Sequence, residues 1–268
     1  KPYYTSYKIS QRNNFNNSYN NNLLTSIFYL IIFIQVITPI IFLLFDIESI
    51  KAIIPSIINN YNDILFTIIT IFISSLFMVL FSTIFAYMSL LDKRFKSFII
   101  LLSIILLTIP SSFIGIAIIS MYNNLPFDTL FYSPLLTAHT LLIRFIPISF
   151  LIIISDFNKY TKEYFDASII NTNSHLKIFK KIILPNSYKS LLYSFIVVSI
   201  LAIGELGASI MILPPGKSTL SIIIYSYLHY GSSNAVKGLS LFVFISCIIF
   251  TLLILIIINK KGETTNYE

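Results

Sequence analysis

Two opposite charges lie deep inside apolar stretches of the chain, Arg144 in one stretch and Glu205 in another. Placing an arginine at membrane depth costs about 2.5 to 3.5 kcal/mol, so Arg144 needs a partner or water. Glu205 has the opposite sign and is the candidate partner. The pair would either fix the register of two helices or form a charged part of a gate or translocation path, and the sequence leaves both interpretations open.

Aromatic and imidazole side chains gather later in the sequence, at Tyr225, Tyr227, His229 and Tyr230. Phenolate and imidazole both ligate transition metals. The same residue types are typical of a membrane boundary, and we expect an aromatic belt here, with Tyr225 near the translocation path and no metal site.

The sequence contains none of the motifs that common ATPases, hydrolases and redox proteins use. It has no Gly-x4-Gly-Lys-Ser/Thr loop to cradle phosphates. It also has no Gly-x-Ser-x-Gly, His-Glu-x-x-His or Cys-x-x-Cys motif, and its one cysteine, Cys247, excludes an intrachain disulfide. We therefore expect a chain that is not an enzyme and that binds no cofactor itself.

Composition predicts the elements that must hold these residues. Of the 268 residues, 56% are hydrophobic and only 11% are charged, which is far from an ordinary soluble domain. A helix needs about 20 apolar residues to cross a bilayer. We predict an all-α, polytopic membrane protein with six transmembrane helices, at residues 23–45, 64–91, 97–121, 134–155, 190–211 and 239–258.

Prolines interrupt this pattern at two places. Pro110 and Ser111 lie inside the third apolar run, where they predict a kinked helix that either lines the pore or packs closely against a neighbour. Pro214 follows Glu205 and is expected to end the fifth helix near the outer face. The run at residues 218–228 is too short to span a membrane, so we expect a re-entrant or interfacial helix near the mouth of the path.

The net charge of +7 is compatible with a nucleic-acid partner, but the positions of the charges argue against one. If the N-terminus is cytoplasmic, 14 of the 18 Lys and Arg lie in inner segments, three lie in outer loops, and Arg144 lies within a span. The first outer loop covers residues 46–63. This distribution follows the positive-inside rule. We expect a multi-pass protein of the cell membrane, with both termini and the loop at residues 156–189 in the cytoplasm.

That cytoplasmic loop contains a predicted docking helix. Asn173 or Ser174 can cap a helix that begins near His175, and Pro185 is expected to end it. Four apolar residues recur at intervals of three and four and would form one face, while the lysines among them point elsewhere. These four are Leu176, Phe179, Ile182 and Ile183. Such a helix fits the groove of a partner protein.

The wider loop resembles the cytoplasmic EAA loop of ABC importer permeases, whose pattern is Glu-Ala-Ala, three residues, Gly, nine residues and Ile-x-Leu-Pro. The matching residues are Ala167, Ile182, Leu184 and Pro185, while Asp166, Ser168 and Thr172 replace the usual Glu, Ala and Gly. The replacement of Gly is the main departure, because Gly would allow a turn with positive φ. The resemblance implies docking on an ATP-hydrolysing subunit through Leu176 and Phe179, with Asp166 and Lys180 as polar contacts.

A second set of segments resembles the iron(III)-type branch of these permeases. They are residues 204–208, 214–216, 219–220, 224–225 and 229–231. The resemblance implies a type I ABC importer permease domain at residues 23–258, flanked by a polar cytoplasmic tail or linker at 1–22 and a cytoplasmic tail at 259–268. The implied partners are an ABC ATPase dimer on which ATP acts, a second permease half that is identical, different or fused, an extracytoplasmic substrate-binding protein and the lipid bilayer. Iron(III) is the expected substrate, and thiamine, polyamine, phosphonate, sulfate and molybdate stay open.

An ion-coupled secondary transporter is the alternative, with Arg144 and Glu205 as relay residues. The sequence lacks the inverted repeat that is usual in that class, and the basic loop would have no role in it. An intramembrane enzyme is disfavoured because no catalytic constellation is present. Association with an ATPase would separate the permease from both.

Overall fold

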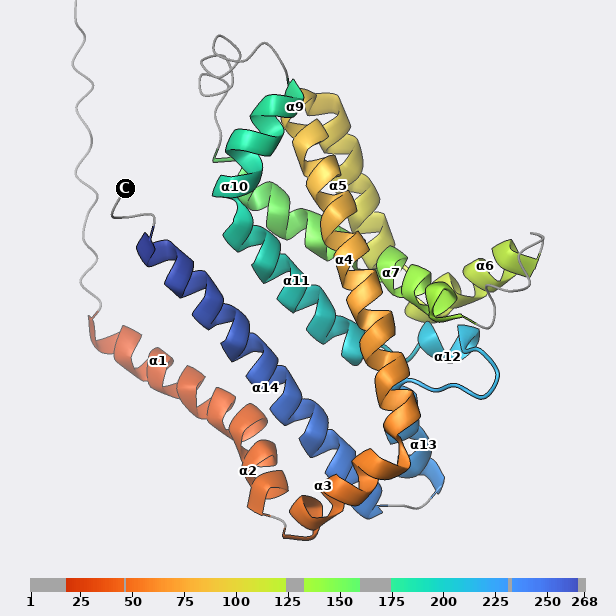
Figure 1. Cartoon of the computed structure of the whole chain (residues 1–268). Coiled ribbons are helices and arrows are strands. Elements are labelled where there is room, and N and C mark those ends of the chain that lie inside the picture. Colours follow the sequence, from red (N-terminus) through yellow and green to blue (C-terminus); the bar gives the residue numbers. More distant parts are fainter. Residues whose placement is uncertain (1–17, 46, 124–132, 160–174, 231–232, 265–268) are drawn as a thin grey trace, which may run out of the picture. The chain divides into compact units, whose positions relative to one another are not determined.

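The computed structural model describes residues 18–45, 47–123, 133–159, 175–230 and 233–264. Every regular element within these ranges is a helix (Figure 1), which confirms the predicted all-α class for this part of the chain. The chain divides into two compact units, Lys1–Ile47 and Glu48–Glu268. The first predicted span lies in the smaller unit, and the other five lie in the larger one.

The smaller unit contains three consecutive helical elements. They are α1 (Ser18–Ile32), the π-helix η1 (Phe33–Ile37) and α2 (Thr38–Phe45). The described helix begins at Ser18, so it includes the last residues of the tail expected at positions 1–22, whose first part lies outside the described residues. The segment Thr25–Phe45 is long and apolar enough to cross a membrane.

The core of the larger unit is a trio of packed helices, α4 (Tyr61–Leu91), α7 (Pro134–Phe157) and α11 (Tyr188–Ile203). Serine side chains join them in pairs. Ser199 Oγ donates to Ser75 Oγ at 2.9 Å, and Ser194 Oγ donates to Ser149 Oγ at the same distance. Small hydroxyl side chains let helices approach closely in an apolar environment and hold them there by hydrogen bonds.

Four described segments are long and apolar enough to cross a membrane, and there are six if each of two bent helix pairs counts as one span. The four are Thr25–Phe45, Tyr61–Leu91, Pro134–Phe157 and Asn234–Ile258, the last of which lies in α14 (Ser233–Thr264). They match the first, second, fourth and sixth predicted spans. Segments of this length and apolar character mark a membrane-embedded protein.

The third predicted span is divided into two helices, α5 (Lys93–Thr108) and α6 (Ser111–Asn123). Their axes differ by 103°, whereas the sequence predicted one kinked helix. The backbone of Ile109 is extended (φ −70°, ψ 128°), which is the conformation that a following proline favours, and Pro110 itself has no N–H to donate. The result is a full change of direction, so that α6 extends sideways from the packed trio (Figure 1).

The fifth predicted span is also shorter than expected. α11 ends at Ile203, well before residue 211, and a non-helical turn separates it from α12 (Ser209–Ile212). At its other end, α11 follows the helix His175–Asn186 at an angle of 69°. That helix consists of α9 (His175–Ile178), the π-helix η3 (Phe179–Ile183) and α10 (Leu184–Asn186). It ends one residue after Pro185, close to the predicted end.

Two further segments complete the larger unit. α3 (Ile47–Asn59) occupies most of the stretch predicted as an outer loop, and it contains Pro55. α13 (Leu220–Tyr230) has 11 residues, in agreement with the predicted short helix. Between α12 and α13 the chain passes Pro214 and reaches Gly216, whose φ of +73° is a conformation that favours glycine.

The two π-helices of the described residues precede a proline at the same spacing. Phe33–Ile37 ends two residues before Pro39, and Phe179–Ile183 ends two residues before Pro185. In each, the amide just before the proline donates to the carbonyl five residues back. A proline in an α-helix clashes with the carbonyl four residues back, and a wider turn relieves this clash.

Candidate functional site

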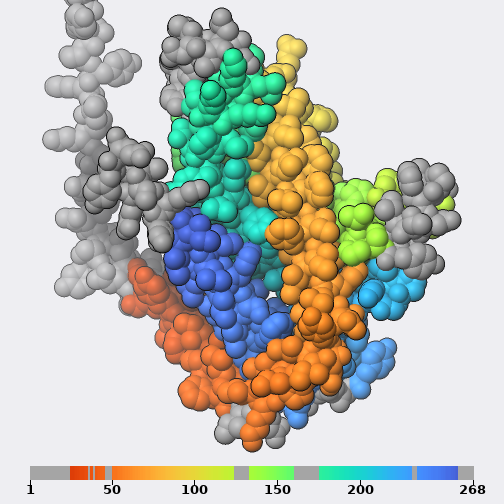
Figure 2. Space-filling model, viewed as in Figure 1, coloured from red at the N-terminus to blue at the C-terminus, as the bar shows by residue number. Residues whose placement is uncertain are grey.

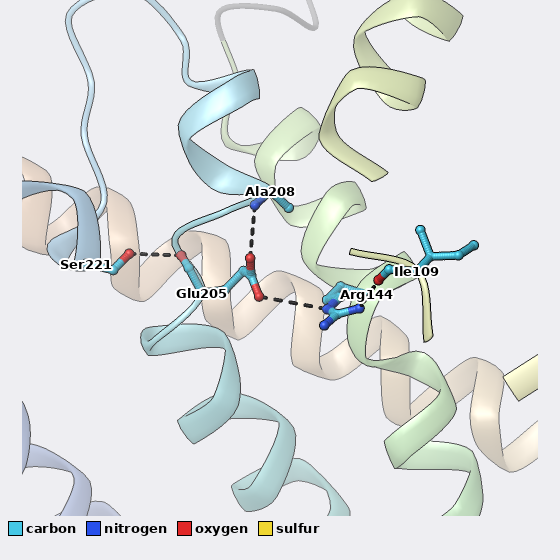
Figure 3. A network of polar contacts seen from close by, with 5 residues as sticks. All are labelled: Ile109, Arg144, Glu205, Ala208 and Ser221. Atoms are coloured by element: carbon cyan, nitrogen blue, oxygen red, sulfur yellow. Dashed lines mark hydrogen bonds and ion pairs between the residues drawn. The ribbon is translucent and has the colours of Figure 1, made fainter. Parts of the chain in front are cut away.

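The interrupted helices of the larger unit meet around Glu205 (Figure 3). The break between α5 and α6 contributes Ile109, and α7 contributes Arg144. The turn after α11 contributes Glu205 and Ala208, and the first turn of α13 contributes Ser221. We call these five residues the charged junction.

Glu205 holds this junction together with both its side chain and its backbone. Its Oε1 accepts a hydrogen bond from the Ala208 N–H at 2.9 Å, and its carbonyl oxygen accepts one from Ser221 Oγ at 2.9 Å. The side chain is only 10% exposed, so the carboxylate depends on donors from the protein. These bonds stabilise the turn after α11 and connect it to α13.

Arg144 reaches the same place from α7. Its Nη1 donates to the Ile109 carbonyl oxygen at 2.8 Å, and its Nε lies 3.9 Å from Glu205 Oε2. The second distance is too long for a hydrogen bond, but two opposite charges at this separation attract each other strongly in a poorly hydrated site. The structure thus brings together the two charges that the sequence proposed as partners.

Glycines bring the backbone of this region into close contact with α6. A Cβ at Gly207 would lie 2.3 Å from Ser111 Oγ, and a Cβ at Gly115 would lie 2.9 Å from the Ala208 carbonyl oxygen. Neither position has room for a larger residue unless its neighbours move. Pro110 and Ser111, two of the predicted path residues, therefore lie beside the charged junction.

The start of α13 is attached to α4 as well. Asp63 Oδ1 accepts a hydrogen bond from the Ser218 N–H at 2.9 Å, and Thr67 Oγ1 accepts one from the Leu220 N–H at 3.0 Å. Because Ser221 belongs to the charged junction, α13 links that junction to α4.

The two remaining predicted path residues have their described contacts elsewhere. Pro214 is buried, and its carbonyl oxygen accepts a hydrogen bond from the Lys217 N–H at 3.1 Å. The ring of Tyr225 packs against that of His229 at a tilt of 37°, with ring centroids 4.1 Å apart. Among the described residues, no group of three or more His, Cys, Asp or Glu is placed to hold a metal ion.

The sequence analysis did not identify three parts of the junction: the Ile109 carbonyl, the Ala208 N–H and Ser221. The first two are backbone groups, which residue type does not reveal. Ser221 lies in the first turn of a short helix, where serine is common, so its position alone does not indicate a bond to Glu205.

The second candidate region is the helix His175–Asn186, which we call the basic helix. One side of it packs on the ends of α4, α5 and α7, where Ile178 and Ile183 are almost completely buried. The hydroxyl of Tyr87 in α4 donates to the His175 carbonyl oxygen at 2.8 Å. Figure 1 shows this helix beside the ends of α4 and α5.

Two residues of the predicted docking face pack partly on the protein itself. The Phe179 ring lies 4.7 Å from the Tyr87 ring, centroid to centroid, and Ile182 packs against the same apolar cluster. Both side chains are half-buried, so each lies partly against the protein and partly on the surface. The prediction assumed an α-helical repeat, whereas the π turn gives a spacing of five residues, which is the spacing between the buried Ile178 and Ile183.

The outward side of the basic helix combines leucines with lysines and lies on the surface (Figure 2). Leu176 is 68% exposed and Leu184 is 38% exposed. The other exposed residues of this side include Lys177, Lys180, Lys181 and Pro185. Three predicted coupling residues, Asp166, Ala167 and Thr172, lie outside the described residues.

No model of a known protein family matches the chain. A search of curated proteins also finds no matching relative. The geometry of the junction and of the basic helix, together with the resemblance of the loop at residues 156–189, is what bears on function.

Proposed function

We propose that the chain is the membrane-spanning permease subunit of an ATP-driven ABC importer and forms half of its translocation path. The observation that carries this proposal is the basic helix, which packs on three membrane helices with one side and exposes leucines and lysines on the other. A helix with these two sides suits a transmitter between a water-soluble partner and the membrane helices. ATP would act on a separate ATPase dimer, and this chain would not be an enzyme.

Each bent helix pair would form one span, so the chain would cross the membrane six times. Both termini would then lie in the cytoplasm. The pair formed by the basic helix and α11 would begin on the cytoplasmic side, where the positive-inside rule favours its lysines. A second permease half would complete the path, and an extracytoplasmic binding protein would deliver the substrate.

Motion would pass from the basic helix to the charged junction. Closure of the ATPase dimer would displace the basic helix, and its buried isoleucines would carry α4 and α7 with it. Because α7 holds Arg144, this displacement would change the 3.9 Å separation from Glu205 and open or close the path there. Iron(III) is the proposed substrate, and thiamine, polyamine, phosphonate, sulfate and molybdate are the other candidates.

The test is to change the outward side of the basic helix without disturbing the buried side. Leu176→Asp should abolish co-purification of the ATPase subunit and ATP-dependent uptake into proteoliposomes, because it places a charge where the partner's groove would meet a leucine. Leu184→Asp, at the other exposed leucine, should act in the same direction. The thermal stability of the isolated chain should change little, since both positions are on the surface.

Asn186→Asp is the matched control, since it adds the same charge to an exposed position of the same helix and removes no apolar contact. It should retain the ATPase. Undiminished ATPase binding by both leucine variants would refute a docking role for the basic helix.

An ion-coupled secondary transporter is the second candidate, and the charged junction favours it. Interrupted helices around a mid-membrane charge pair are typical binding sites of such transporters. In this case purified protein without any ATPase would accumulate substrate when an ion gradient is applied, and Glu205→Gln would abolish this uptake. Uptake that requires ATP and an ATPase subunit would exclude this candidate.

A further inference from the structure

α3 carries a stripe of isoleucines that faces away from the protein, while Ile57 beside it packs partly on the core. Ile50, Ile54 and Ile58 recur every four residues along it, with exposed fractions of 52%, 68% and 68%. At about 100° per residue, the three form one stripe along the helix. A helix at the surface of a water-soluble domain turns such a stripe toward the core. In α3 the stripe faces outward instead.

The opposite side of α3 packs closely on the larger unit. Ala52 and Ser56 point about 180° away from the centre of the isoleucine stripe. A Cβ at Gly238 in α14 would lie 2.8 Å from the Ala52 carbonyl oxygen, so the two helices touch through their backbones. Ser56 is 4% exposed, and its carbonyl oxygen accepts a hydrogen bond from Asn60 Nδ2 at 2.8 Å. These contacts fix α3 with its isoleucines outward.

Polar groups line a pocket on the packed side of α3. A pocket of about 300 Å³ lies between α3, the start of α4, α13 and the start of α14, and its lining includes Asn59, Asn60 and Asn234. The hydroxyl of Tyr227 donates to Asn60 Oδ1 at 3.0 Å there. Rotation of α3 would place isoleucines in this polar pocket and remove the close contact with α14, so the outward stripe is the stable arrangement.

Both ends of α3 are joined directly to membrane-crossing segments. Only residue 46 separates α3 from the apolar segment Thr25–Phe45, and only Asn60 separates it from α4. Its 13 residues span about 20 Å, which is less than the roughly 30 Å of a hydrocarbon core. α3 therefore neither crosses the membrane nor extends away from it.

We propose that α3 is an interfacial helix that lies in the plane of the membrane, with its isoleucine stripe immersed in the acyl chains of one lipid leaflet. Lipid is the occupant that the connectivity favours, because chain segments that leave and enter the bilayer hold both ends of the stripe at its boundary. Lys51 is exposed beside the stripe, where its long side chain reaches the lipid phosphates. The inference holds for a permease and for a secondary transporter alike.

Spin labels can measure the surroundings of each side of α3 in vesicles of phosphatidylcholine and phosphatidylglycerol. In a Cys247→Ala background, which removes the chain's one cysteine, labels are attached to Ile54→Cys and, as the matched control, Asn59→Cys. Molecular oxygen concentrates in acyl chains, whereas a nickel chelate stays in water. The label at residue 54 should show a ratio of oxygen to nickel collisions several times that at residue 59, and labels at Ile50→Cys and Ile58→Cys should repeat the result.

Two outcomes overturn the proposal. Nickel-chelate access to residue 54 that is high and equal to that at residue 59 would show that the stripe faces water. Protection of residue 54 from both reagents would show that protein covers it, either the first span of this chain or a second copy. Elution of each labelled variant at the volume of the unlabelled protein establishes that the labels report on a folded chain.

Discussion

The charged junction and the basic helix are both places where the chain interrupts a helix, but opposite kinds of contact hold them. At the junction, an ion pair and hydrogen bonds to backbone groups join Arg144 and Glu205 to their surroundings. At the basic helix, Ile178 and Ile183 are buried in an apolar cluster that α4, α5 and α7 share. The first region is polar, and the second is apolar.

This difference shows where the molecule can change shape at low cost. A hydrogen bond contributes about 1 kcal/mol net because water or another donor can replace it, so the contacts of the junction are exchangeable. A close-packed apolar cluster has few alternative arrangements, and each large side chain removed from it costs several times more. The basic helix should therefore move as one body with α4 and α7, and the change of shape should be concentrated at the junction.

The largest effect is expected from Glu205→Ala. It leaves Arg144 with little exposure and without its opposite charge, which typically costs about 3 to 5 kcal/mol. Thermal unfolding in detergent measures the loss. The double variant Arg144→Met/Glu205→Leu should recover most of the stability, because it removes both charges. A single variant as stable as the original chain would mean that the ion pair does not hold the junction.

The apolar packing of the basic helix can be tested by Phe179→Ala. Removal of the ring from the cluster with Tyr87 should cost about 2 to 3 kcal/mol in the free energy of unfolding. Leu176→Ala, on the exposed side of the same helix, is the control and should cost less than about 0.5 kcal/mol. Equal costs for the two variants would contradict the assignment of buried and outward sides.

The contact between the junction and α6 can be tested by Gly207→Ala. The new methyl group would lie 2.3 Å from Ser111 Oγ, which must rotate or move, so a cost of about 1 to 2 kcal/mol is expected. In a Ser111→Ala background the clash with the hydroxyl is absent, and the cost should fall. Unfolding of the two single variants and the double variant forms a cycle that measures this coupling. Additive costs would show that the two breaks do not touch.

The smallest effect is expected from Tyr87→Phe, which keeps the ring against Phe179 and removes the hydroxyl that donates to the His175 carbonyl. The expected cost is about 1 kcal/mol. Hydrogen exchange should become faster at the start of the basic helix and stay unchanged in α11. Faster exchange throughout both helices would indicate that this bond, and not the apolar cluster, holds the region together.

The membrane helices were predictable because apolar runs longer than about 20 residues have few other structures open to them. The partnership of Arg144 and Glu205 was predictable for a related reason, since opposite charges inside apolar runs need each other. The 103° bend at Pro110 was not predictable, because proline permits anything from a kink to a complete break. Packing against neighbouring helices decides between a kink and a complete break.

The contact of Phe179 with Tyr87 could not be derived from its spacing either. Helix periodicity assumes 3.6 residues per turn, and one π turn shifts every later residue to another face. The stretch at residues 46–63 was expected to be an outer loop, yet α3 lies there and its isoleucines recur every four residues. That spacing is present in the sequence and predicts a helix with one apolar stripe.

The π turn at Phe179–Ile183 contains one residue more than the same length of α-helix would need. Loss of that residue would restore ordinary helical winding and leave Leu176 and Lys177 on the same face, because the wider turn already accommodates the extra residue. The exposed surface of the basic helix should therefore keep its direction after a one-residue deletion in the π turn, whereas the same deletion in a regular α-helix would rotate it by about 100°.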